Sequence, residues 1–249
     1  MSTQQGITQN QPADVRPPLS RLTRVELRKM VDTRSGFWLQ LSVLALTVLV
    51  VVITLLAGHE DEFTFRNILG NALVPAGILL PVVGILLVSS EWSQRTALVS
   101  FALVPERARL IAAKVLAGVV LGLLATAFAA VVAALGTLVA SPAIANVWTF
   151  PIGLVGQYVV YVVTAMVIGV AFGAALQASA PAIVLYFALP AAIGALGSIH
   201  AITGTVEWFS SGSFEWLVQN VLSGHEWAQV LVALALWMVL PLAIGVWRG

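Results

Sequence analysis

The chain has 249 residues, of which 59% are hydrophobic and only 9% are charged, and its mean hydropathy is +0.98. So little charge cannot cover the surface of a water-soluble domain, which excludes a soluble globular protein. The lack of cysteine excludes disulfides, thiol chemistry and cysteine metal sites.

The amino-terminal segment is polar and basic. It has no short apolar core near its start, so it does not have the pattern of a cleaved signal peptide. Residues 1–18 are rich in Gln, Pro and Thr, a composition that predicts a disordered cytoplasmic tail.

Residues 19–34, LSRLTRVELRKMVDTR, have an amphipathic pattern. At helical spacing, leucines and Met30 fall on one side. Three basic residues gather on the other side: Arg21, Arg24 and Arg28. We predict an amphipathic helix on the cytoplasmic membrane surface, before the chain turns inward at Gly36. Glu26 lies within the apolar arc, where a carboxylate is poorly placed against lipid. This face is therefore expected to contact another protein, although a helix that only anchors the first span explains the pattern almost as well.

Runs without charge indicate the membrane spans. They comprise residues 35–58, 67–90, 115–206 and 227–247. A helix needs about 20 apolar residues to cross the bilayer core, so three of these runs fit one span each. The long run is broken near Ser141-Pro142 and again after Gln177, which gives three spans. We predict an all-α polytopic membrane protein whose six-span domain covers residues 35–249, with spans at about 36–58, 69–90, 113–140, 152–176, 181–200 and 226–247.

The basic residues predict the orientation. Eleven of the twelve Lys and Arg lie on one side of a six-span topology, and only Arg66 lies on the other. The positive-inside rule makes the basic side cytoplasmic, so both termini are expected in the cytoplasm. High Ala, Val and Gly content with far more Arg than Lys is typical of GC-rich bacterial genomes, which indicates a bacterial cytoplasmic membrane.

The predicted spans hold no Asp, Glu, Lys or Arg in their central parts. Proton relays and ion-coupled transporters need such groups, so a proton relay is disfavoured. The two lysines, Lys29 and Lys114, do not follow a glycine-rich turn, and the chain therefore lacks an ATPase motif. Paired carboxylates, a Ser/His/Asp set and metal-ligand clusters are also missing from the spans, which disfavours an embedded enzyme. No metal site is predicted.

The loop at residues 91–109 is the only substantial loop on the basic side. It reads as a short surface helix that ends at Pro105. Three basic residues at the start of the third span are interpreted as flanking charges that reach lipid phosphates: Arg107, Arg109 and Lys114. The positive-inside rule explains basic residues but not the carboxylate of Glu91. For Glu91 and Arg95 we therefore favour a contact with a partner protein.

This loop resembles that of the type-2 ABC exporter permeases, whose pattern is Glu, an aromatic residue, a short gap, Thr, then Pro, basic residues and Lys. The matching residues are Glu91-Trp92, Arg95-Thr96, Pro105, Arg107, Arg109 and Lys114. The family commonly has Gly where this chain has Arg95. Residues 25–40, VELRKMVDTRSGFWLQ, also resemble the segment that leads into the family's first span.

The resemblance implies a permease without its own ATPase or cofactor. Two copies, or two related chains, would associate with two nucleotide-binding subunits that bind ATP and Mg. The residues expected to face the ATPase are Glu91, Gln94, Arg95 and Thr96, flanked by Arg24, Glu26, Arg28 and Lys29. Membrane lipids are further expected partners and nucleic acid is not. The implied substrate is apolar or amphipathic and moves outward. A membrane anchor or assembly protein without transport activity remains the alternative.

The outer side carries three Glu-Trp pairs within residues 204–227. They are Glu207-Trp208, Glu215-Trp216 and Glu226-Trp227. This region is too apolar for a free loop and too short for two spans, so we predict re-entrant helices between spans 5 and 6. An aromatic belt with carboxylates in water is the favoured interpretation, and an outer gate formed by the first two pairs is the alternative.

Polar and small residues mark the predicted fourth span. Gln157, Tyr161 and Thr164 share one face, either as a substrate path or as ordinary interfacial residues. Gly169 and Gly173 are four residues apart, a spacing that lets helices pack closely, with packing inside one subunit as the default.

Overall fold

The structure of the protein is a computed structural model that describes residues 17–59, 63–93, 107–140, 147–148, 150–197 and 203–248. Among these residues, six helices are long and apolar enough to cross a membrane. They are α2 (Arg34–Ala57), α3 (Phe65–Ser93), α5 (Arg107–Ala140), α6 (Ile152–Leu176), α7 (Ser179–Gly197) and a last helix built from α10 (Gly224–Leu234), η2 (Ala235–Val239) and α11 (Leu240–Arg248). The prediction of an α-helical protein with six such helices is confirmed, and the chain is a multi-pass membrane protein.

Three shorter helices complete the described part of the chain. α1 (Leu19–Asp32) precedes the first span, and α8 (Thr203–Phe209) and α9 (Ser213–Gln219) lie between the last two. The tail predicted to be disordered falls, up to residue 16, outside the described residues. So do residues 94–106 of the predicted coupling loop.

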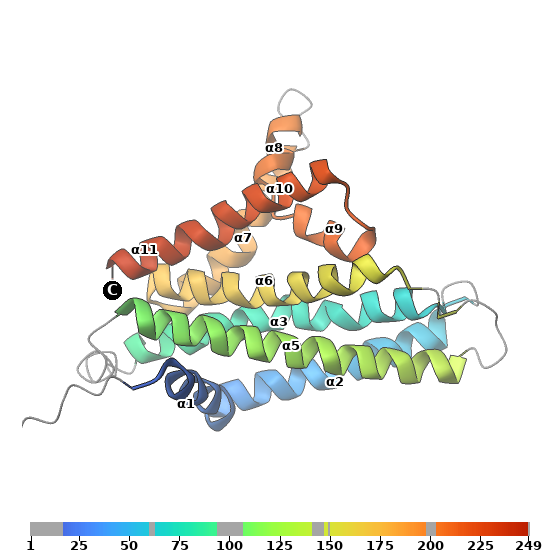
Figure 1. The fold of residues 1–249 in the computed structure, drawn as a ribbon, viewed down its shortest axis with the longest axis horizontal. Helices are drawn as coiled ribbons and strands as arrows, with labels where there is room; N and C mark the ends of the chain where they lie inside the picture. The colour runs from blue at the N-terminus through green and yellow to red at the C-terminus, as the bar shows by residue number, and fades with distance from the viewer. Residues whose placement is uncertain are drawn as a thin grey trace, which may run out of the picture.

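Four helices run side by side across Figure 1, namely α2, α3, α5 and α6. The last helix, from α10 to α11, inclines over α6, and α7 diverges toward α8 at the apex. α1 lies beside the start of α5, at the same end of the bundle as the C-terminus. The helix before the first span and the end of the last span therefore lie at the same end of the bundle, as an even number of spans requires.

α3 and α6 form the centre of the bundle. Within their apolar stretches 67% and 72% of the residues are buried, against 6% for α7. Glycines allow this contact, because a Cβ on Gly169 would fall on the backbone of Pro81 and one on Gly173 would lie 2.8 Å from the Ile85 carbonyl oxygen. The predicted close packing at these two glycines is thus found within the chain.

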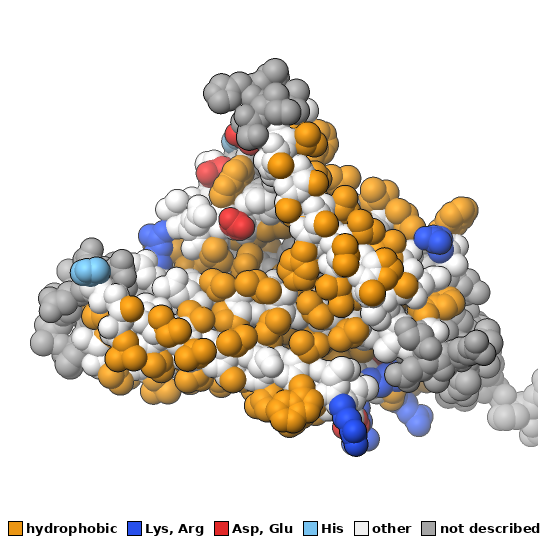
Figure 2. Space-filling view, turned by 180° about the vertical axis from the view of Figure 1, so that it is seen from behind, with side chains coloured by type: hydrophobic (Ala, Val, Ile, Leu, Met, Phe, Trp, Pro, Cys, Tyr) orange, Lys and Arg blue, Asp and Glu red, His pale blue; other side chains and the backbone are white. Residues whose placement is uncertain are grey.

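The exterior is largely apolar (Figure 2). Lys and Arg side chains gather at the end of the molecule where α1 lies, while most of the visible acidic side chains lie away from it. The end of the bundle that carries α1 and the C-terminus is called the basic end below, and the end that carries α9 is called the opposite end.

Candidate functional site

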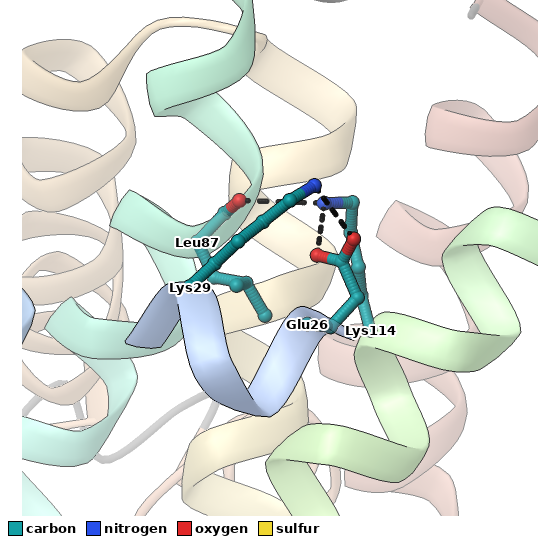
Figure 3. Close-up of polar contacts among 4 residues, drawn as sticks. All are labelled: Glu26, Lys29, Leu87 and Lys114. Carbon is teal, nitrogen blue, oxygen red and sulfur yellow. Dashed lines mark hydrogen bonds and ion pairs between the residues drawn. The ribbon is translucent and has the colours of Figure 1, made fainter. Parts of the chain in front are cut away.

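A buried ion pair joins α1 to α5 at the basic end (Figure 3). The Lys114 ammonium nitrogen lies 2.6 Å from Glu26 Oε2, and both side chains are only 2% exposed. Lys29 donates to the other carboxylate oxygen at 2.8 Å from a partly exposed side chain. Lys114 also donates to the Leu87 carbonyl of α3 at 3.5 Å, so three helices meet at this ammonium group. Two cationic donors compensate the charge of a carboxylate that water cannot reach.

A tight elbow between α1 and α2 holds Glu26 in place. The Thr33 hydroxyl accepts a hydrogen bond from the Gly36 N–H at 3.2 Å and so caps α2. Gln40 Nε2 donates to the Met30 carbonyl at 2.8 Å and satisfies the end of α1. A Cβ at position 36 would fall on that same carbonyl oxygen, so the close approach of the two helices requires glycine. The elbow folds α1 back against α5.

The ion pair corrects two interpretations made from the sequence. Lys114 does not reach lipid phosphates, because its ammonium group is buried against Glu26. Glu26 does not present its carboxylate to another protein, because the apolar arc of α1 packs against the bundle of its own chain. The other α1 residues expected near an ATPase have side chains that reach the surface. Arg24 and Arg28 are exposed and Lys29 is half-exposed.

The remaining coupling candidates are described only in part. Glu91 belongs to α3, which continues to Ser93, and the helix of the second span therefore leads directly into the predicted coupling loop. Gln94, Arg95 and Thr96 lie outside the described residues.

Two further basic side chains bond to the backbone at this end. Arg109 Nη2 donates to the Pro17 carbonyl at 2.8 Å, which ties the start of α5 to the segment before α1. Arg248 Nη1 donates to the Ala175 carbonyl at 3.1 Å, which ties the C-terminal helix to α6. Arg109 therefore connects two elements of the fold and is not only a flanking charge.

At the opposite end, Gln157 of α6 holds the segment that follows α9. Its Nε2 donates to the Asn220 carbonyl at 2.7 Å and to the Leu217 carbonyl at 3.2 Å, and its Oε1 accepts from the Leu222 N–H at 3.3 Å. The side chain is buried, so these bonds satisfy the whole amide. Gln157 is a structural clamp and does not line the cavity that Tyr161 and Thr164 border.

Two neighbouring residues extend this clamp. The Tyr158 hydroxyl donates to the Val218 carbonyl at 3.2 Å. Arg66, at the start of α3, donates to the Gln219 carbonyl and, at 3.2 Å, to Asn220 Oδ1. α3 and α6 therefore both fix the end of α9 against the bundle.

A cavity of about 220 Å³ lies between α3, α6, α7, α9 and the π-helix η2. Tyr161 and Thr164 of α6 line it together with Glu215 of α9, so three of the residues singled out from the sequence meet at one place. Tyr186 of α7 and Trp237 of η2 complete its aromatic wall. The cavity combines apolar surface with a few polar groups, the usual character of a small-molecule site.

The other residues of the predicted outer gate are not among the residues that line this cavity. Glu207 is exposed on α8. The Trp208 ring meets His225 edge to face, with ring centroids 5.3 Å apart. Trp216 is partly buried against a cluster of apolar residues that includes Phe214, Leu217 and Trp237. Of the two Glu-Trp pairs, only the second contributes a residue to the cavity.

The sequence did not single out Tyr158, Tyr186 and Trp237, or the clamp formed by Arg66. Arg66 carried a usable signal, because it is the one basic residue on its side of a six-span topology. Trp237 sits on a π-helix, an irregularity often found at functional sites, but no residue pattern predicts it.

No group of three or more His, Asp or Glu that could hold a metal ion occurs among the described residues. The chain matches no family model and no curated protein.

Proposed function

We propose that this chain is the transmembrane permease subunit of an ABC exporter. It would move an apolar or amphipathic compound out of the cell, using ATP that a separate nucleotide-binding subunit binds with Mg and hydrolyses. The resemblance of residues 91–114 to the coupling loop of type-2 permeases supports this proposal. So do the six helices and the position of α1 and the C-terminus at one end of the bundle.

The buried Glu26–Lys114 pair carries the proposal. A permease must transmit movement of its ATPase into its spans, and this requires a firm connection between the surface elements and the bundle. The ion pair links α1 to α5, and Lys114 also bonds to α3, the helix that leads into the coupling loop. Separating these helices would expose an unpaired charge in a dry interior, so they are expected to move together.

The basic end is proposed to face the cytoplasm of a bacterial cell. In this orientation α1 lies at the inner membrane surface with Arg24 and Arg28 exposed. Glu91 lies near the end of α3, from which the chain enters the predicted coupling loop. An ATPase subunit would dock on this combined surface.

A second permease copy, or a related chain, is proposed to complete the transport path. α7 is the least buried of the six helices, and large apolar side chains such as Val184 and Leu196 are exposed on it. Such a surface suits lipid or another membrane helix. α8 and α9 are proposed to dip into the outer leaflet, with the second Glu-Trp pair at the outer gate.

The test is purification of the tagged chain from native membranes in mild detergent, followed by identification of its partners. Glu91→Ala and Arg95→Ala test the coupling loop. Arg107→Ala is the matched control, because this residue at the start of α5 is interpreted as a lipid-facing charge.

Recovery of a P-loop ATPase in about equal amount supports the proposal, provided that the first two substitutions reduce it and the control does not. A wild-type chain that comes alone, or only with partners that lack a nucleotide site, contradicts the proposal. The function would then be that of a membrane anchor or assembly protein.

A further inference from the structure

The cavity between α3, α6, α7, α9 and η2 has the composition of a cation site. Five aromatic side chains line it, Tyr161, Tyr186, Phe187, Phe214 and Trp237, together with the carboxylate of Glu215. Among the described residues, no Lys or Arg belongs to its lining. The faces of aromatic rings attract cations, and a carboxylate favours them further, whereas an anion would be repelled.

The Glu215 carboxylate is available for a ligand. It makes no hydrogen bond and no ion pair with the described residues. Arg66, the one basic residue of the sequence on this side of the topology, is engaged with Gln219 and Asn220 instead. The carboxylate lies close enough to Tyr161 to interact with it electrostatically, which places its negative charge beside the aromatic wall.

A second cavity adjoins the first across Trp237. It has a volume of about 330 Å³ and an almost wholly apolar lining, which includes Phe172, Leu185, Leu189 and Pro241. Trp237 borders both cavities, and α7 contributes to the walls of both. Trp237 is held by a hydrogen bond of 2.9 Å from its indole nitrogen to the Phe209 carbonyl and by stacking on Phe172. A polar head and an apolar tail can therefore lie on the two sides of one fixed indole ring.

We propose that the two cavities together bind an amphipathic organic cation. A quaternary or protonated amine occupies the first cavity against Glu215 and the aromatic rings, and the alkyl chain occupies the second. This inference names a substrate class for the proposed exporter and rests on that proposal only for the transport of the ligand. Binding itself requires no ATPase. The same headgroup chemistry occurs in free cationic amphiphiles and in choline lipids.

The test uses the full chain in nanodiscs that lack choline lipids and measures binding of radiolabelled dodecyltrimethylammonium by equilibrium dialysis. Glu215→Gln is expected to weaken binding roughly ten-fold, because it removes the only charged side chain among the described residues of the lining. Glu207→Gln is the matched control, since it removes an exposed carboxylate from another Glu-Trp pair outside the cavity, and binding should be unchanged. A neutral analogue with carbon in place of the quaternary nitrogen should bind more weakly than the cation.

Nanodiscs that contain phosphatidylcholine distinguish the two sources of the headgroup. Binding that persists identifies a free cation as the ligand, and competition by the lipid identifies a choline headgroup; both outcomes support the proposed chemistry. Equal loss in the Glu215 and Glu207 variants would show that only surface charge attracts the probe. That result, or a neutral analogue that binds as tightly as the cation, would overturn the inference and leave the test of ATPase partnership unaffected.

Discussion

The two ends of the bundle use a carboxylate in opposite ways. At the basic end, Glu26 is buried and paired with two lysines, and it joins α1 to α5. At the opposite end, Glu215 has no protein partner among the described residues and faces a cavity lined with aromatic rings. A paired, buried carboxylate stabilises one arrangement of helices, whereas an unpaired one beside a cavity is available to a ligand. The difference separates a group that holds the fold from a group that we propose recognises a substrate.

We expect the largest loss of stability when the ion pair at the basic end is broken. Lys114→Met leaves the Glu26 carboxylate buried with only Lys29 to compensate it, and should destabilise the chain by about 3 kcal/mol. The midpoint of thermal unfolding in detergent, followed by tryptophan fluorescence, measures this loss. Arg28→Met, on the exposed face of α1, is the control and should change little. The double variant Glu26→Gln/Lys114→Met should recover most of the stability, and a double variant as unstable as the single one would contradict the ion-pair explanation.

The next effect concerns the clamp beside the cavity. Gln157→Leu leaves the Leu217 and Asn220 carbonyls and the Leu222 N–H without their partner, at a cost of about 2 kcal/mol. Hydrogen exchange of the amides in residues 217–222 should become faster.

Val155→Leu, at an exposed position on the same helix, is the control and should leave that exchange as in the wild type. Unchanged exchange in the Gln157 variant would mean that other contacts hold this segment.

The loss of stability should be smaller for Lys29 than for Lys114, the other lysine that contacts Glu26. Lys29 donates to Glu26 from a side chain that is 39% exposed, so water already screens part of this interaction. Lys29→Met should therefore lower stability by less than about 1 kcal/mol. A loss equal to that of Lys114→Met, in the same unfolding measurement, would show that burial does not decide the strength of the pair.

The smallest change in stability is expected for Glu215, the carboxylate without a hydrogen bond or ion pair to a described residue. Glu215→Gln removes a charge that makes no hydrogen bond or ion pair with a described residue, so stability should stay within about 0.5 kcal/mol of the wild type. A large loss would mean that Glu215 has a structural role. Thermal unfolding of the unliganded chain provides the comparison, and it also establishes that the variant used for binding is folded.

The six helices could be predicted because they follow from length and charge alone. A run such as residues 152–176 is long enough to cross a membrane and ends at Pro, Gln and Ser positions that interrupt a helix. The close helix packing at Gly169 could also be predicted, because small residues four positions apart form a flat helix surface.

Only one partner of the ion pair could be recognised from the sequence. Glu26 was visibly out of place on an apolar arc, but its partner lies 88 residues away and belongs to a group of charges that orientation alone explains. The positive-inside rule counts charges and does not say which of them is buried. Only the elbow at Gly36, which turns α1 back onto the bundle, brings Glu26 to Lys114.

The cavity depends even more on tertiary structure. Tyr161, Tyr186, Glu215 and Trp237 come from four helices, and nothing in the sequence links them. The sequence grouped Gln157 with Tyr161 and Thr164 because they share a helix face. The segment after α9 covers the first of these residues and leaves the other two facing the cavity.

ATP hydrolysis by the complex purified from native membranes is the decisive test of the permease proposal. We expect hydrolysis that copurifies with the chain and is stimulated by dodecyltrimethylammonium, with the stimulation lost in Glu215→Gln and kept in Glu207→Gln. A purified chain without associated hydrolysis would contradict the permease function. Hydrolysis that responds equally to the cation in both variants would contradict the assignment of the cavity as its recognition site.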